Sequence, residues 1–156
     1  MVFLITGTAG GAPVPTRGER NNNPGNIVEG GGWLGDIGLE IVPRGMSYRP
    51  RFARFDTAFH GIRALAKQLL VYQQRHGLRS ILAMVNRWAP AGDGNATDAY
   101  AAAACNYCGV SSTDDFPLTV GDNLENLTFA IIRQENGRVM YDGATIHAAV
   151  ADALAS

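Results

Sequence analysis

From residue 56 onward the chain repeats one pattern, in which a segment with apolar residues on one helical face is followed by a short helix-breaking segment. Apolar residues spaced three and four apart share one face of a helix, and a following Gly or Pro ends it. The first such helix is expected to begin at Asp56 or Thr57 and to stop at Gly77. The pattern predicts about five helices, at residues 58–72, 80–88, 97–107, 122–137 and 143–153.

The first 55 residues have a different composition, rich in Gly, Pro and Asn, with little helical periodicity. Residues 38–42 and 48–55 contain β-branched and aromatic residues and are predicted to pair as a small hairpin. We therefore expect a mainly α fold with a minor β part. At 156 residues the chain is long enough for one domain with its own core. We divide it into an extended segment (1–16), a loop lobe (17–55) and a helical body (56–155).

Charge and hydropathy exclude several classes of function. The net charge is −1 and the 13 Lys and Arg residues are scattered, so no nucleic-acid partner is expected. No run of 18 apolar residues is present, so no membrane insertion is expected either. The apolar residues at the N-terminus lack a preceding basic segment, and this predicts that the chain has no signal peptide.

Metal and cofactor chemistry find no support in the sequence. Cys105 and Cys108 have no second cysteine pair, and we expect them to be buried free thiols. His60, His76 and His147 are spaced too irregularly to form a ligand pair. We therefore predict no metal site and no cofactor.

The most unusual carboxyl group is that of Glu135, near the end of the fourth predicted helix. Asp122 is a candidate N-cap, Glu125 occupies the capping-box position, and Gly137 ends the segment. Glu135 continues the apolar stripe of this helix, which is formed by Leu124, Leu127 and Ile131. Burial on that stripe and the unpaired carbonyls of the last turn both favour a protonated carboxyl group, as a general acid requires. The alternative is a solvent-exposed glutamate at a frayed helix end.

A second unusual segment is Arg20-Asn-Asn-Asn-Pro-Gly-Asn-Ile27 in the loop lobe. Asn and Gly accept left-handed backbone angles and Pro24 restricts its neighbour, so the segment is expected to fold sharply. Amide side chains both donate and accept hydrogen bonds, which suits the acetamido and hydroxyl groups of a sugar. The alternative is a turn whose amides satisfy one another. The predicted sugar-binding residues of the lobe are Asn21, Asn22, Asn23, Asn26 and Trp33.

Several motifs in this order resemble a family of phage and prophage virion-associated proteins. They are the Asn-rich segment, Gly32-Trp33-x-Gly35, Phe52-x-x-Phe55-Asp56, Gly61-Ile-Arg63-Ala64, Trp88-Ala-Pro90, Asn95-x-Thr97-x-x-Tyr100 and Ile132-x-x-Glu135-Asn-Gly137. The same pieces are similar to the lysozyme-like superfamily, which includes lytic transglycosylases and cell-wall glucosaminidases. In those glucosaminidases the helix with the catalytic Glu comes first, whereas here it comes after the other motifs.

The resemblance implies a circularly permuted lysozyme-like fold that cleaves the glycan strands of peptidoglycan as a muramidase or lytic transglycosylase. Glu135 would be the general acid, facing the Asn-rich segment and residues 33–55 across a groove. Asp36 and Glu40 are the candidates for the second carboxylate that glycoside hydrolysis usually needs. Tyr141 would stabilise the developing positive charge or simply pack.

Two alternatives stay open at this point. Glu19 is a rival acid, although Arg17 and Arg20 on either side are expected to lower its pKa and no helix is predicted to hold it. The protein would alternatively be a virion structural component or a peptidoglycan-binding protein without turnover. The predicted partners are bacterial peptidoglycan and other virion proteins. The predicted location is the virion, or the host cytoplasm with later release to the wall.

Overall fold

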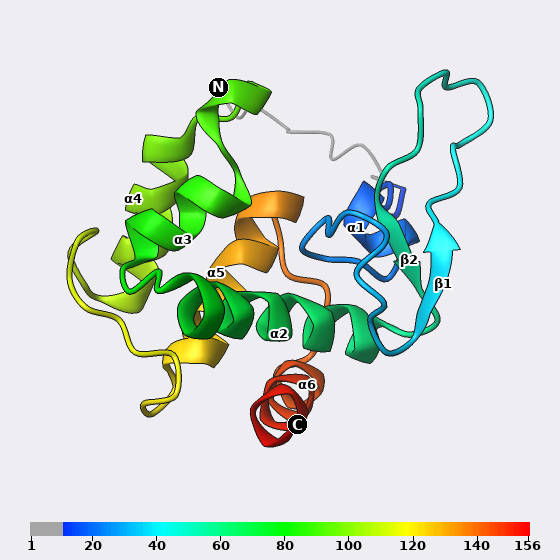
Figure 1. Cartoon of the computed structure of the whole chain (residues 1–156). Helices are drawn as coiled ribbons and strands as arrows, with labels where there is room; N and C mark the ends of the chain where they lie inside the picture. The colour runs from blue at the N-terminus through cyan, green and yellow to red at the C-terminus, as the bar shows by residue number, and fades with distance from the viewer. Residues whose placement is uncertain (1–10) are drawn as a thin grey trace, which may run out of the picture.

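The computed structural model describes residues 11–156, so most of the predicted extended segment lies outside the described part of the chain. The described residues form six α-helices, one short 3₁₀ helix and two strands (Figure 1). In chain order these are α1 (Arg17–Arg20), β1 (Asp36–Leu39), β2 (Ala53–Phe55), α2 (Ala58–His76), α3 (Ile81–Trp88), η1 (Ala91–Asp93), α4 (Thr97–Cys108), α5 (Asn123–Asn136) and α6 (Gly143–Ala155).

The predicted mainly α fold with a small hairpin is confirmed, and so are most helix ends. The Thr57 hydroxyl accepts a hydrogen bond from the His60 amide and caps α2, and Ser80 caps α3 in the same way. Three helices stop where a glycine adopts a left-handed backbone angle, which residues with a side chain rarely adopt. These glycines are Gly77, Gly109 and Gly137.

The structure corrects three details of the prediction. A sixth helix, α1, begins in the lobe, where Thr16 and Glu19 form a capping box. The strands are shorter than predicted and pair antiparallel with an irregular register. Asp122 precedes α5 but its side chain makes no capping hydrogen bond, and its backbone lacks the extended conformation typical of a capping residue. Glu125 pairs with His147 on α6.

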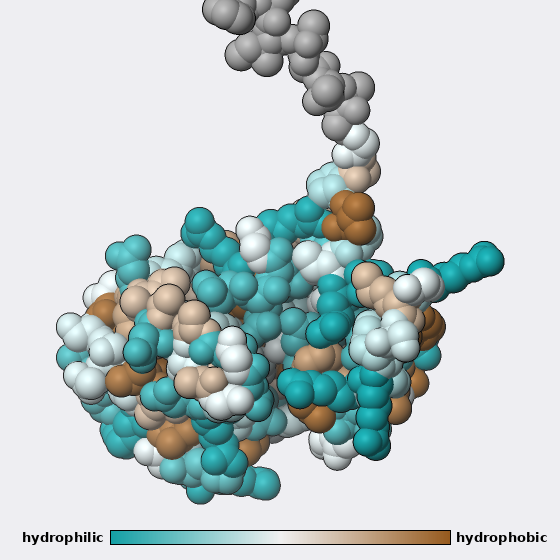
Figure 2. All heavy atoms as spheres, turned by 90° about the horizontal axis from the view of Figure 1, so that it is seen from above, coloured by the Kyte–Doolittle hydropathy of each residue, from teal (hydrophilic) through white to brown (hydrophobic). Residues whose placement is uncertain are grey.

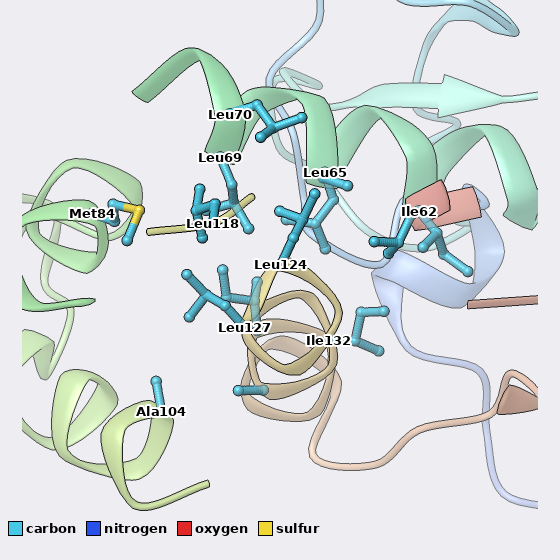
Figure 3. Close-up of a cluster of buried hydrophobic side chains, with 14 of the residues drawn as sticks. Ile62, Leu65, Leu69, Leu70, Met84, Ala104, Leu118, Leu124, Leu127 and Ile132 are labelled. Carbon is cyan, nitrogen blue, oxygen red and sulfur yellow. The ribbon is translucent and has the colours of Figure 1, made fainter. Parts of the chain in front are cut away.

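The core lies between α2 and the helices around it (Figure 3). Residues of α2 and α5 face one another at its centre, with Met84 of α3, Ala104 of α4 and Leu118 closing its sides. The fully buried large residues include Ile62, Leu65, Leu69, Leu124, Leu127, Ile131 and Ile132. The stripe that precedes Glu135 is therefore in the core, as predicted, and it fixes the face of α5 on which Glu135 lies.

The lobe packs against the helical body through close backbone contacts. An added side-chain carbon at Gly61 of α2 would overlap the carbonyl oxygen of Asn22. At Gly25 it would come within 2.9 Å of the Trp88 ring. The Asn136 side chain donates to the carbonyls of Pro24 (2.9 Å) and Ile132 (2.8 Å). These contacts hold the Asn-rich segment against the end of α5.

Two further findings concern membranes and metals. Within residues 11–156, no helix is long and apolar enough to cross a bilayer. Over the same range, no three His, Cys, Asp or Glu residues are grouped so that they could hold a metal ion. Both Cys105 and Cys108 are free, the former buried and the latter half-buried.

Candidate active site

Glu135 lies in the last turn of α5, half-buried, and both of its carboxylate oxygens accept a hydrogen bond. Asn26 Nδ2 donates to Oε2 at 3.0 Å, and the Tyr100 hydroxyl donates to Oε1 at 3.2 Å. Tyr100 is only 6% exposed, and its burial, together with the nearby Glu135, raises the pKa of its hydroxyl. Tyr100 therefore keeps its proton and acts as a fixed donor to the carboxylate.

The carboxylate opens onto a groove of about 470 Å³. One wall comes from the lobe and the other from the end of α3, η1 and the loop before α4; its lining residues include Arg17, Asn26, Arg51, Phe52, Tyr72, Arg87, Trp88, Asp93, Asn95 and Glu135. In the space-filling view from above, a furrow separates the lobe, with its long hydrophilic side chains, from the helical mass (Figure 2). Glu135 thus lies in a groove between parts of the chain that are far apart in sequence.

Of the four asparagines predicted to bind sugar, only Asn26 lines the groove. The side chains of Asn21, Asn22 and Asn23 donate to backbone carbonyls within the lobe and at its junction with α2. Asn23 and Asn21 are also almost completely buried. These three residues therefore shape the lobe, while Asn26, whose φ is 49°, is turned toward Glu135.

Trp33 lies in a smaller hollow of about 190 Å³ next to the groove. This hollow shares Asn26, Val28, Tyr72 and Trp88 with the groove, so the two form one continuous surface. An extended ligand in the groove would have Trp33 within reach at one end.

The two predicted partner carboxylates, Asp36 and Glu40, do not line the groove. Asp36 accepts a hydrogen bond from the Gly38 amide of its own strand, β1. Glu40 is 4% exposed and accepts from the Tyr48 hydroxyl (3.1 Å) and the Arg51 amide (3.3 Å). The carboxylate that does line the groove with Glu135 is Asp93, an exposed residue of η1 that the sequence analysis did not single out.

The rival acid Glu19 lies elsewhere and is fully paired. Arg138 donates to both of its carboxylate oxygens, at 3.0 and 2.8 Å, and this pairing lowers the pKa of Glu19 despite its burial. The direction of the shift agrees with the prediction, but the cause is Arg138 and not Arg17 or Arg20. The expectation that no helix holds Glu19 was wrong, because α1 does.

Tyr141 also lies away from Glu135. It lines a separate hollow together with Glu19, Arg20 and Arg138. Burial, and to a lesser extent the charge of Glu19, raises the pKa of Tyr141 to about 12. Its predicted contact with a reacting sugar therefore finds no support in the geometry, and packing beside Glu19 describes its position.

Sequence reasoning missed Tyr100 and the arginines of the groove. Tyr100 belongs to a motif that we noted, Asn95-x-Thr97-x-x-Tyr100, but nothing local connects it with a glutamate 35 positions later. Arg17, Arg51 and Arg87 are spread along the chain, and only the fold gathers them.

Comparison with known proteins identifies a related phage protein. The chain is 36% identical to Protein P5 of Pseudoalteromonas phage PM2 in an alignment 156 positions long, which covers 90% of this chain and 88% of the phage protein. It belongs to the Protein P5 family. No protein-family model matches the chain. Membership in the Protein P5 family identifies a phage-type protein, in agreement with that part of the predicted resemblance, and the name Protein P5 itself states no activity.

Proposed function

We propose that this protein cleaves the glycan strands of peptidoglycan and that Glu135 is its general acid and base. The observation that carries the proposal is how the glutamates of the described chain are partnered. Glu19 binds Arg138, and Glu40 lies 3.4 Å from Arg17. Glu135 has only the neutral donors Asn26 and Tyr100 and no ion pair within residues 11–156. A carboxyl group at the wall of a groove, held in place by neutral donors, has the position that a general acid and base requires.

The lining of the groove suits a sugar chain. Tyr72 and Trp88 offer aromatic surface, and Asn95 and Asn26 offer amides. Sugar rings pack on aromatic faces through their C–H groups while their hydroxyl and acetamido groups need hydrogen-bond partners. The volume of about 470 Å³ falls within the usual range for small-molecule binding sites, and the hollow next to Trp33 extends it.

In the proposed reaction, the protonated Glu135 donates its proton to the oxygen of the β-1,4 bond between N-acetylmuramic acid and N-acetylglucosamine. The C–O bond breaks, positive charge develops on the sugar ring, and the substrate's acetamido group assists. The ionised Glu135 then takes a proton from the C6 hydroxyl of the N-acetylmuramic acid. The oxygen of that hydroxyl bonds to C1 of the same sugar and closes the 1,6-anhydro ring. Tyr100 and Asn26 hold the carboxylate in position through both steps.

Lytic transglycosylation is the version that we favour over hydrolysis. Hydrolysis usually needs a second carboxylate at a set distance from the acid. Asp36 and Glu40 lie outside the groove, and Asp93 sits on an exposed turn. Transglycosylation needs only Glu135, because the nucleophile is a hydroxyl group of the substrate.

The phage family gives this activity a biological setting. A phage must open the host wall locally during entry, or open it completely at lysis, and a peptidoglycan-cleaving protein carried in the virion or released in the cell would do either. The lysozyme-like relationship, with the glutamate helix after the Asn-rich segment instead of before it, is part of the same proposal. The lysozyme-like relationship is supported by the hydrogen bond between Asn26 of the Asn-rich segment and Glu135, which are 109 residues apart in the chain.

The test compares wild type with Glu135→Gln on purified cell walls. Glu125→Gln is the matched control, because Glu125 lies on the same helix but faces His147. We expect loss of turbidity with wild type and the control, none with Glu135→Gln, and equal thermal stability of all three. Mass spectrometry of the released fragments should find 1,6-anhydro ends. Equal lysis by Glu135→Gln would contradict the proposed role, and binding of walls without any cut would favour a non-catalytic virion or wall-binding protein.

A further inference from the structure

Two arginines of the lobe share one aromatic ring at the wall of the groove. The guanidinium carbons of Arg17 and Arg51 lie 5.0 and 4.8 Å from the centre of the Phe52 ring. Arg17 lies in addition 5.1 Å from the Tyr48 ring. Arg17, Phe52 and Arg51 all line the groove that contains Glu135. We call Arg17 and Arg51 the arginine pair.

The positive charge of the pair is only partly balanced. Glu40 is the nearest carboxylate, but its oxygens already accept hydrogen bonds from Tyr48 and from backbone amides. Arg17 Nε is 3.4 Å from Glu40 yet is not aligned for a hydrogen bond, and its side chain is 41% exposed. Arg51 is exposed and forms no ion pair with a carboxylate of the described residues. Among the described residues, Glu40 is thus the one carboxylate paired with Arg17, Arg51 has none, and both arginines line the groove.

Packing on the Phe52 ring does not by itself explain why the guanidinium groups of Arg17 and Arg51 lie beside each other. A cation over an exposed aromatic ring gains about 0.5–1 kcal/mol, and two like charges close together repel. An anionic ligand would relieve the repulsion, and the planar guanidinium group matches a carboxylate with two parallel hydrogen bonds. The aromatic ring would then keep both guanidinium groups in place for that ligand.

We infer that the arginine pair is a subsite for carboxylate groups carried by the substrate. This inference rests on the proposed function and narrows its substrate class. The sugar rings of peptidoglycan are flanked by peptide stems with free carboxylates, whereas chitin has no carboxylates and glycan without stems keeps only the lactyl carboxylate of its muramic acid. The pair lies on the lobe wall, beside the position that a sugar chain near Glu135 would occupy. It would thus select glycan that still carries its peptides.

The test uses Arg51→Gln, since the Arg51 side chain is exposed and only its backbone amide bonds Glu40. Arg49→Gln is the matched control, an exposed arginine two positions earlier that does not line the groove. Each variant is given intact sacculi and stripped sacculi, whose stems an amidase has removed and whose exposed lactyl carboxylates have then been converted to neutral amides. Glycan products are counted by mass spectrometry. We expect Arg51→Gln to lose about tenfold on intact sacculi, since a hydrogen-bonded charge pair contributes that much, and little on stripped glycan. Arg51→Lys keeps the positive charge but lacks the planar guanidinium group. Its activity on intact sacculi should therefore lie between those of wild type and Arg51→Gln.

Equal loss on both substrates, or no difference from Arg49→Gln, would overturn the subsite. A second readout separates this failure from failure of the proposed function. In the Glu135→Gln background, co-sedimentation with intact and stripped sacculi measures binding alone. If wild type makes no glycan products, the proposed function fails, while a stem-dependent loss of binding in Arg51→Gln would still support the subsite.

Discussion

Asn136 is the residue whose removal should most directly loosen the lobe from the helical body. It follows Glu135 at the end of α5, and its side chain makes three hydrogen bonds. Nδ2 donates to the Pro24 carbonyl at 2.9 Å and to the Ile132 carbonyl at 2.8 Å, while Oδ1 accepts from the Thr16 hydroxyl at 2.6 Å. Two of these bonds join segments more than 100 residues apart in the chain.

The cost of Asn136→Ala follows from these contacts. Each of the two bonds to the lobe contributes about 1 kcal/mol, and the Pro24 carbonyl loses a partner in a half-buried position, which adds roughly 1 kcal/mol more. Alanine is the better helix former by about 0.5 kcal/mol, which offsets part of the loss. We expect a decrease of about 2.5 kcal/mol in the free energy of unfolding, and a melting temperature lower by roughly 5–10 °C.

Urea unfolding measures this difference, with Asn106→Ala as the control. Asn106 is an exposed helical asparagine on α4, and no side-chain hydrogen bond is found for it among the described residues. The control should be unchanged or slightly more stable, because only the helix preference acts there. If the two variants differ by less than about 0.5 kcal/mol, the Asn136 contacts do not hold the lobe and the reasoning fails.

Three further predictions follow from single contacts. Tyr100→Phe removes one donor to Glu135 and should lower the rate of glycan cleavage roughly tenfold with little change in stability; an unchanged rate would mean that Tyr100 does not position the carboxylate. Gly61→Ala should destabilise the protein by at least about 2 kcal/mol in urea unfolding because its methyl meets the Asn22 backbone, whereas Gly143→Ala, where the methyl meets nothing, should not. Glu19→Gln should cost about 2 kcal/mol at neutral pH. The pKa of Glu19 is lowered in the folded state, so this contribution is complete above the unfolded pKa of about 4.3 and should disappear as the pH falls through the folded value; a pH-independent difference would contradict it.

The helical part of the fold was predictable because its signals are local. Apolar spacing, a capping Ser or Thr and a terminal Gly act within a few residues, and they fixed α2, α3 and α4 closely. The capping box Thr16-x-x-Glu19 was an equally local signal for α1. The helix was missed because, with four residues, it is too short to show a repeating apolar pattern. Asp122 directly precedes α5 but does not cap it, and its backbone angles, φ −95° and ψ 15°, are not the extended ones of a capping residue.

The site was only partly predictable, because its geometry depends on the packing of distant segments. The stripe of α5 placed Glu135 correctly at the edge of the core. Which asparagine of the lobe would reach it depended on backbone angles: the φ values of Asn22 and Asn26 are both positive, and only Asn26 ends up in the groove. Tyr100 comes from α4 and Asp93 from η1, and no local pattern encodes the position of either element relative to α5.

If Glu135 acts as proposed, stability and activity should be separable, because different contacts hold the lobe and the carboxylate. Asn136 and Gly61 join the lobe to the body without touching the Glu135 side chain, whereas Tyr100 touches Glu135 and belongs to the body alone. If Glu135 acts as proposed, Asn136→Ala should reduce activity mainly near its melting temperature, where the lobe that carries Asn26 detaches. Tyr100→Phe should reduce it at every temperature. Identical temperature dependence of the two variants would mean that the carboxylate is positioned by the lobe as a whole, and that its hydrogen bond with Tyr100 contributes nothing to the reaction.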